Sequence, residues 1–167
     1  MARLNYSDDE DFSGQCALWQ ANCRRSLRGL AGQRALRDLE TALLALPEPR
    51  LIRDRLWQDG EVCAIGAYAQ YKGLDIRTWD PEDESDEVGV AAGMPRLVAW
   101  KVVEFNDIDL NVVWEVADGP LNRYQATYHG GTALVRDMTP EERYQRMLAW
   151  VQRQLGIGCS HGSESHR

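Results

Sequence analysis

The sequence has no long apolar run and no apolar segment near its start. A membrane-spanning helix needs about 20 consecutive apolar residues, and no stretch of this chain approaches that length. Residues 1–11 end in a run of acids and lack the apolar core of a secretory signal. These two absences predict a protein of the cytoplasm that makes no contact with a membrane.

Cysteine is scarce, and no two cysteines have the C-x-x-C spacing of many zinc and redox sites. They are Cys16, Cys23, Cys63 and Cys159. Since nothing indicates export, we expect reduced thiols. Cys16 and Cys23 are two helical turns apart, which is too far for a disulfide. Cys159 shares the polar segment 157–167 with two histidines, but three donors there seldom close a tetrahedral metal site. We expect no metal and no cofactor.

Positive charge is outnumbered, because 26 acidic residues against 19 Lys and Arg give a formal net charge of -7. Sequence-independent binding to nucleic acid depends on neutralising phosphates, so an acidic chain is poorly suited to it. Association with a basic partner protein is electrostatically easier. We therefore expect a protein partner, and nucleic acid is a poor candidate.

What the chain does contain is apolar residues at helical spacing. Positions 34–46 carry a stripe of Ala and Leu that ends at two prolines, and other elements must cover this stripe. Gly29 and Gly32 are expected to separate this helix from the preceding one. The same kind of pattern predicts further helices at 13–28, 61–73 and 139–155.

The last of these helices has the clearest boundaries. Thr139, Pro140 and Glu142 form a capping-box pattern at its start, and Gly156 is expected to end it. Its apolar stripe leaves Arg143 on the predicted outer face.

The segment 110–136 is rich in β-branched residues and turn residues, which predicts a small antiparallel β meander with a turn at 118–120. A chain of 167 residues with 44% hydrophobic residues suits one globular domain. We predict an α+β, mainly α, fold: a helical bundle-like domain at 1–156 that includes this meander. A disordered tail is expected at 157–167.

Two charged segments are candidate partner-binding sites. The acidic one consists of Asp80, Glu82, Asp83, Glu84, Asp86 and Glu87. The basic one consists of Arg24, Arg25 and Arg28, which with Arg34 and Arg37 make five positive charges and no intervening acid. The basic segment could dock an acidic partner or a phosphate, or it could be a solvated face balanced by the protein's own acids.

Residues 86–105 have the layout of a helix-turn-helix unit. A short helix, a break at Gly93 and a second helix with Pro95 in its first turn fit that pattern. The second helix offers Arg96 and Lys101 among apolar residues, whereas base readout needs Arg, Asn and Gln on an exposed face. A helical pair in the core is the favoured interpretation, and DNA recognition is an alternative.

An enzyme would need a nucleophile and a base, and the sequence offers two isolated candidates. Cys63 lies near the start of a predicted helix, where the dipole could lower the pKa of its thiol, but no histidine is nearby. His129 lies beside two glycines, and no adjacent residue forms a catalytic group with it. We expect no catalytic residue, and an enzyme using Cys63 or His129 is a further alternative.

Two passages carry a resemblance to known proteins. They are Ala35-Leu-Arg-Asp-Leu-Glu-Thr-Ala-Leu-Leu-Ala-Leu-Pro47 and Gly60-Glu-Val-Cys-Ala-Ile-Gly-Ala67. Together with Asn106-Asp107 and the start of the last helix, they resemble small uncharacterised proteins encoded by bacteriophages and prophages. This resemblance implies a viral accessory protein acting inside a bacterium, and it supplies no activity or catalytic residue. The segment 110–136 lies outside it.

The leading hypothesis is a non-enzymatic phage accessory protein that binds a host or phage protein. One specific form is an inhibitor of a bacterial defence system, such as an anti-CRISPR protein, in which the acidic segment 80–87 would mimic nucleic acid. The alternatives are the DNA-binding regulator and the small enzyme described above. The oligomeric state is left open.

Overall fold

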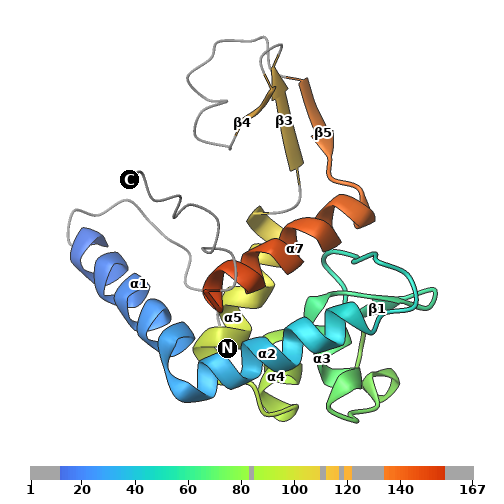
Figure 1. The fold of residues 1–167 in the computed structure, drawn as a ribbon, viewed down its shortest axis with the longest axis horizontal. Coiled ribbons are helices and arrows are strands. Elements are labelled where there is room, and N and C mark those ends of the chain that lie inside the picture. Colours follow the sequence, from blue (N-terminus) through green and yellow to red (C-terminus); the bar gives the residue numbers. More distant parts are fainter. Residues whose placement is uncertain (1–11, 83–84, 110–111, 117–118, 122–133, 157–167) are drawn as a thin grey trace, which may run out of the picture.

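Helices make up most of the structure, a computed structural model that describes residues 12–82, 85–109, 112–116, 119–121 and 134–156 (Figure 1). The fold is α+β and mainly α, which confirms the predicted class. The predicted tail at 157–167 lies outside the described residues. In the described ranges, no helix combines the length and apolarity needed to cross a membrane.

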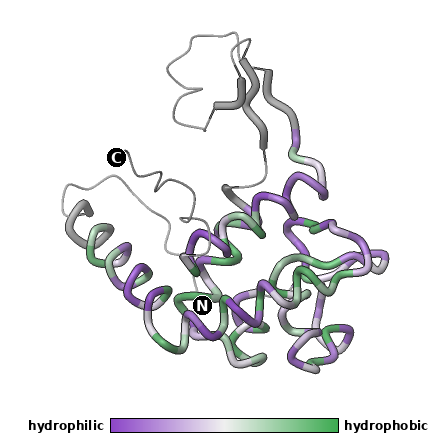
Figure 2. The backbone as a smooth tube through the Cα atoms, in the orientation of Figure 1, coloured by the Kyte–Doolittle hydropathy of each residue, from purple (hydrophilic) through white to green (hydrophobic). Residues whose placement is uncertain are grey.

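The leucine-rich helix α2, Leu30–Leu44, lies at the centre of the core. Leu36, Leu39 and Leu43 are completely buried, as the stripe predicted. Helix α2 packs against α3, Ala64–Tyr71, and α7, Pro140–Gln154. Figure 2 shows apolar and polar residues alternating along the helices, which is the pattern of helices with one buried face.

Gly32 does not separate the first two helices, which corrects the prediction for this residue. Helix α1, Phe12–Arg28, ends just before Gly29, and α2 already begins at Leu30. Gly32 is buried within α2, where a Cβ atom would lie 1.9 Å from the backbone oxygen of Ser26. Glycine is needed there because the two helices approach too closely for any side chain.

The segment 61–73 is only partly helical. Its first residues form strand β2, Glu61–Val62, which pairs with β1, Trp57–Gln58, in a short hairpin. Asp59 and Gly60 both have positive φ, as a two-residue hairpin turn requires. Cys63 then caps the start of α3.

Two helices follow the irregular stretch that contains the 3-10 turn η1, Ile76–Thr78. Helix α4, Ser85–Ala91, and helix α5, Arg96–Glu104, are joined at Gly93, which has a φ of 94°. Helix α5 continues into a π-helical turn η2, Phe105–Asp109.

A small antiparallel sheet projects from the helical body (Figure 1). Its central strand β3, Val112–Val116, pairs with β4, Gly119–Leu121, and with β5, Leu134–Asp137. The predicted small antiparallel sheet is therefore present, but the described strands do not form a meander, because β5 pairs with β3 and not with β4. Gly119 and Pro120 belong to a strand and not to a turn. The predicted strand at 123–128 and His129 lie outside the described residues. The capping box of α7 is confirmed, with Thr139 and Glu142 bonded to each other's backbone N–H groups.

Candidate functional site

Helix α1 has one face that packs on the body of the protein. Cys23 and Leu27 are buried, and the ring of Trp19 meets that of Trp100 on α5 edge-on at 5.0 Å between centroids. Helix α1 also packs along α2. These contacts determine which side of α1 faces the solvent.

The opposite side of α1 is open and basic. Leu18, Ala21, Arg24, Arg25 and Arg28 are all exposed. At about 100° per residue, four of them lie across the helix from Cys23, and Arg24 lies at the edge of this side, next to Arg28. We call these five residues the arginine face. Leu18 is 64% exposed, and Leu30, just beyond the end of α1, is 90% exposed. Basic and large apolar side chains thus share one surface.

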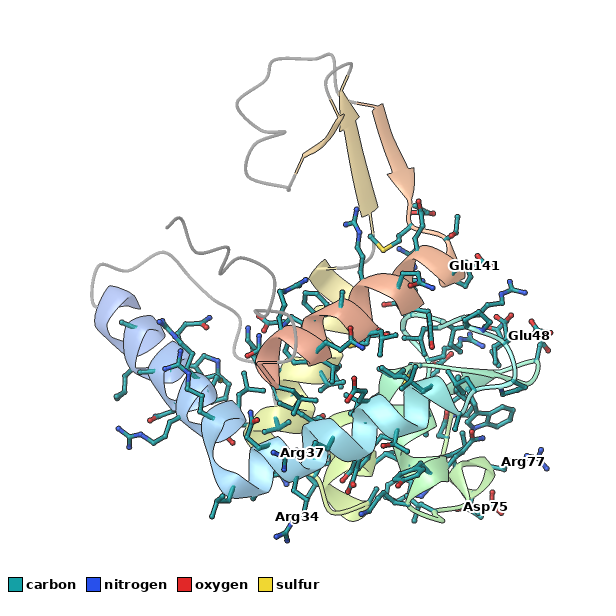
Figure 3. All side chains as sticks on the ribbon, viewed as in Figure 1. Arg34, Arg37, Glu48, Asp75, Arg77 and Glu141 are labelled. Carbon is teal, nitrogen blue, oxygen red and sulfur yellow. The ribbon has the colours of Figure 1, made fainter. Side chains whose placement is uncertain are left out.

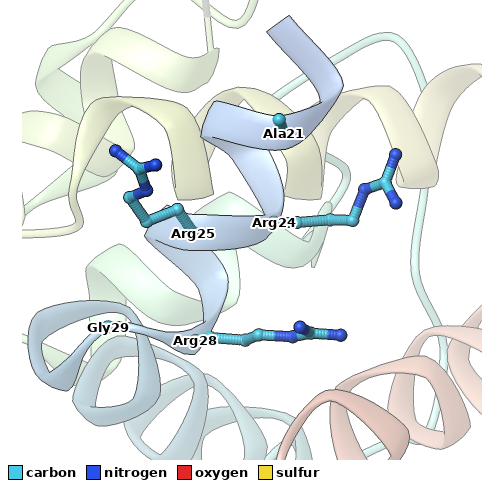
Figure 4. A pocket seen from close by; sticks show the side chains of 5 residues that line it. All are labelled: Ala21, Arg24, Arg25, Arg28 and Gly29. Carbon is cyan, nitrogen blue, oxygen red and sulfur yellow. The ribbon is translucent and has the colours of Figure 1, made fainter. Parts of the chain in front are cut away.

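The arginine face contains a shallow open hollow of about 570 Å³ (Figure 4). Arg24 and Arg28 extend on one side of it, and Arg25 extends on the other. Ala21 and Gly29 complete the lining, and their small size leaves the space between the arginines free. The long aliphatic stems of arginine make the walls of such a hollow apolar and its rim positive.

No ion pair within 4.0 Å forms at Arg24, Arg25 or Arg28 with any residue in the described ranges. Among the described residues, the side-chain hydrogen bonding of these three arginines is limited to a bond from Arg24 Nε to the backbone carbonyl of Gln20, at 3.3 Å. The interpretation as a face balanced by the protein's own acids therefore has no support within the described residues.

Five basic side chains elsewhere form ion pairs with described acids. Arg50 meets Glu48, Glu61 and Glu141, and the other pairs are Arg53–Asp54, Arg53–Asp137, Arg55–Glu82, Lys72–Asp38 and Lys101–Glu104. Six further arginines also lack an ion pair with any described residue, and among them only Arg34 and Arg37 lie within one helical turn of each other; the others are Arg77, Arg96, Arg146 and Arg153. The arginine face differs because three such charges fall within five residues.

Arg34 and Arg37 extend from α2 and do not line the hollow (Figure 3). Both are exposed and neither forms an ion pair with a described residue. The five arginines that follow one another without an intervening acid are therefore divided between two helices. We restrict the candidate site to the three arginines of α1.

The acidic segment 80–87 is partly used by the fold itself. Glu82 pairs with Arg55 at 3.0 Å, and its backbone N–H donates to Asp80 Oδ1 at 2.9 Å. Asp86 and Glu87 lie in the first turn of α4, where the helix dipole favours negative charge. Asp83 and Glu84 lie outside the described residues. These interactions give the segment a structural role, and it makes no ion pair with the arginine face among the described side chains.

The helix-turn-helix candidate at 86–105 forms the expected pair of helices, but the second helix is covered. Helix α5 packs against α1, α3 and α4, and within Arg96–Glu104 only Arg96 is exposed. Val98, Ala99 and Val102 are buried. A reading helix must enter the major groove with an open face, so this packing argues against DNA readout by α5.

Cys63 is buried, with 4% of the residue exposed. Its Sγ accepts a bond from the N–H of Gly66 at 3.4 Å, and burial raises the pKa of the thiol to about 12. The expected lowering of this pKa by the helix dipole is therefore wrong, since desolvation outweighs it. His129 lies outside the described residues.

Sequence reasoning missed a partly buried polar cluster that joins three segments. Asp107 Oδ1 accepts bonds from the N–H of Asp54 at 3.1 Å and from Asn106 Nδ2 at 2.6 Å, and Arg143 Nη1 donates to the carbonyl of Leu51 at 3.3 Å. We call Asp54, Asn106, Asp107 and Arg143 the polar junction.

The polar junction runs from the interior to the surface: Asn106 and Arg143 are buried, Asp107 is partly buried and Asp54 is exposed. Asn106 and Arg143 are 2% and 3% exposed, so the predicted outward position of Arg143 is wrong. Burial raises the pKa of Asp107 and lowers that of Arg143. Asp54 has a φ of 60°, unusual for a residue other than glycine. The one available signal was that Arg143 precedes Met147 and Val151 by four and eight residues, on the edge of the apolar stripe.

No group of three or more His, Cys, Asp and Glu side chains in the described ranges could hold a metal ion. Comparison with known proteins gives no match to a family model, to a curated protein or to a solved structure. The candidate site is therefore assigned from its own geometry.

Proposed function

We propose that this protein is a binding protein that docks onto an acidic surface of another protein through its arginine face. The observation that carries the proposal is the concentration of three exposed arginines within five residues, none of which forms an ion pair with a described acid. Arginine is also the basic residue most enriched at protein interfaces.

Two features support a protein partner. The exposed Leu18 lies on the same side of α1 as the arginines and offers apolar area that a docked protein would bury. The formal net charge of -7 works against long-range attraction of nucleic acid, whereas a local basic surface still complements a local acidic one.

The resemblance to bacteriophage proteins directs the choice of partner. Under this proposal the protein acts as a phage accessory protein inside a bacterium and binds a host or phage protein. A component of a bacterial defence system, such as a CRISPR effector, is the first partner to examine. The arginine face replaces the acidic segment 80–87 as the preferred docking surface.

Affinity capture from bacterial lysate tests the proposal. The test variant combines Arg24→Glu, Arg25→Glu and Arg28→Glu. The control variant makes the same change of charge elsewhere, with Arg96→Glu, Arg146→Glu and Arg153→Glu. We expect wild type and control to retain the same acidic protein, identified by mass spectrometry, and the test variant to lose it. Equal capture by the two variants, or no protein above background, would contradict the proposal.

A further inference from the structure

The arginine face has a defined chemical layout that limits what can occupy it. Its hollow is lined by the apolar stems of the arginines and by the small residues Ala21 and Gly29, with guanidinium groups on both sides (Figure 4). Leu18 lies three residues before Ala21, so it extends the apolar area along the same side of α1. A ligand that matches this surface must present an apolar group with negative charge on either side of it.

The spacing of the arginines gives the spacing of the negative groups. Arg24 and Arg28 are one helical turn apart, about 6 Å along the axis, and Arg25 lies across the hollow from them. Guanidinium groups bind carboxylates in paired hydrogen bonds. Carboxylates a few residues apart in a peptide can therefore reach both sides of the hollow while the side chain between them enters it.

From this complementarity we infer that the arginine face binds an acidic peptide segment in which an apolar anchor residue stands between carboxylates. The inference rests on the proposed function and specifies the ligand of the same site. The occupant is a segment of a partner protein, held by ion pairs at the rim and by apolar contact with Leu18 and the arginine stems.

Nucleic acid fits this surface less well. A duplex carries one negative charge per about 1.7 Å of its length, so the acidic remainder of this chain opposes its approach. A phosphate backbone also has no apolar group to cover Leu18. Binding to a duplex is therefore an outcome that would count against the inference.

Fluorescence anisotropy with purified full-length protein tests the inference. The probe is a labelled peptide with a Glu-Asp-Leu-Glu-Asp core between Gly-Ser flanks, and the matched peptide has Ser in place of Leu. A labelled duplex of about 20 base pairs is the third probe. The proteins are wild type, the pair Arg24→Gln and Arg28→Gln, the control pair Arg146→Gln and Arg153→Gln, and Leu18→Ser.

We expect wild type to bind the leucine peptide about tenfold more tightly than the serine peptide, because only leucine gains from apolar burial. The Arg24/Arg28 pair should lose about tenfold or more, and the Arg146/Arg153 pair should stay within about twofold. Leu18→Ser should reduce binding of the leucine peptide and leave the serine peptide unaffected, which a merely electrostatic surface would not do.

Three results would overturn the inference: no peptide binding, equal affinity for the two peptides, or tighter binding of the duplex than of the leucine peptide. The lysate experiment separates this failure from that of the proposed function. If the arginine face captures a protein but binds no peptide, the docking role stands and the anchored acidic segment is wrong. If the peptide binds but no protein is captured, the ligand chemistry stands and the cellular role is wrong.

Discussion

The polar junction and the arginine face both hold arginine, but in opposite settings. Arg143 in the junction is almost fully buried, donates to the carbonyl of Leu51 and has Asp107 and Asp54 as charged neighbours. The arginines of α1 are exposed, and no described acid lies within ion-pair distance of them. The polar junction uses the charge of Arg143 to join segments of the fold, whereas the arginine face leaves its charges available to a binding partner.

This difference separates two kinds of contribution. A buried charge is costly to remove from water, so it remains only where the surrounding groups compensate it, and its loss should be felt in stability. Exposed charges contribute little to stability because water solvates them well. Substitutions in the two regions should therefore affect different measurements.

The largest expected effect is that of Arg143→Met. Methionine keeps much of the side-chain volume but leaves the partly buried Asp107 without a positive neighbour on α7, so we expect the free energy of unfolding to fall by about 3 kcal/mol. Urea denaturation followed by circular dichroism measures this change.

Arg146→Met is the matched control for Arg143→Met. Arg146 is an exposed arginine on the same helix, and its loss should change the free energy of unfolding by less than about 0.5 kcal/mol. Adding Asp107→Asn to Arg143→Met should restore part of the stability, since no uncompensated charge then remains. Equal free energies of unfolding for Arg143→Met and Arg146→Met would contradict a stabilising role for Arg143 in the polar junction.

A smaller effect is expected for Asp107→Asn, and it should depend on pH. Burial raises the pKa of Asp107 above its ordinary value of 3.8, so the folded protein binds this proton more tightly than the unfolded chain does. The stability of wild type relative to Asp107→Asn is therefore greatest below the unfolded pKa. It should fall as pH rises through the folded pKa, and then level off.

Urea denaturation of both proteins between about pH 3 and pH 7 measures this difference. Asparagine retains an oxygen that can accept the bonds from Asp54 and Asn106, so the comparison isolates the ionisation. Parallel stability profiles across this range would contradict the raised pKa.

The helices of this fold could be predicted from local patterns, because the leucine stripe of α2 and the capping box of α7 depend on nearby residues. The hairpin at 57–62 could not, since its strands are too short to show an alternating pattern. Gly32 was misread because its role depends on Ser26 approaching from another helix. The sequence shows that position 32 is glycine, but it does not show that the backbone of the preceding helix lies against it.

The candidate site could be predicted only in part. The run of arginines was visible in the sequence, but its division between α1 and α2 and the absence of described acids near it are properties of the folded chain. Arg143 was missed for the same reason. Its neighbours Asp54 and Asp107 are distant in sequence, and helical spacing alone cannot identify such compensation.

The smallest effect on stability is expected for the triple variant Arg24→Gln, Arg25→Gln and Arg28→Gln. Arg25 and Arg28 lie in the last turn of α1, where positive charge interacts favourably with the helix dipole, so a loss of about 1 kcal/mol or less should follow. That dipole interaction is the competing explanation for two of these arginines. It does not apply to Arg24, which precedes the last turn, or to the exposed Leu18. Urea denaturation and peptide anisotropy on the same samples separate the two explanations. If the arginines form a docking surface, the triple variant loses peptide binding while its free energy of unfolding barely changes. If they act only on the helix dipole, the variant loses stability and keeps its peptide binding.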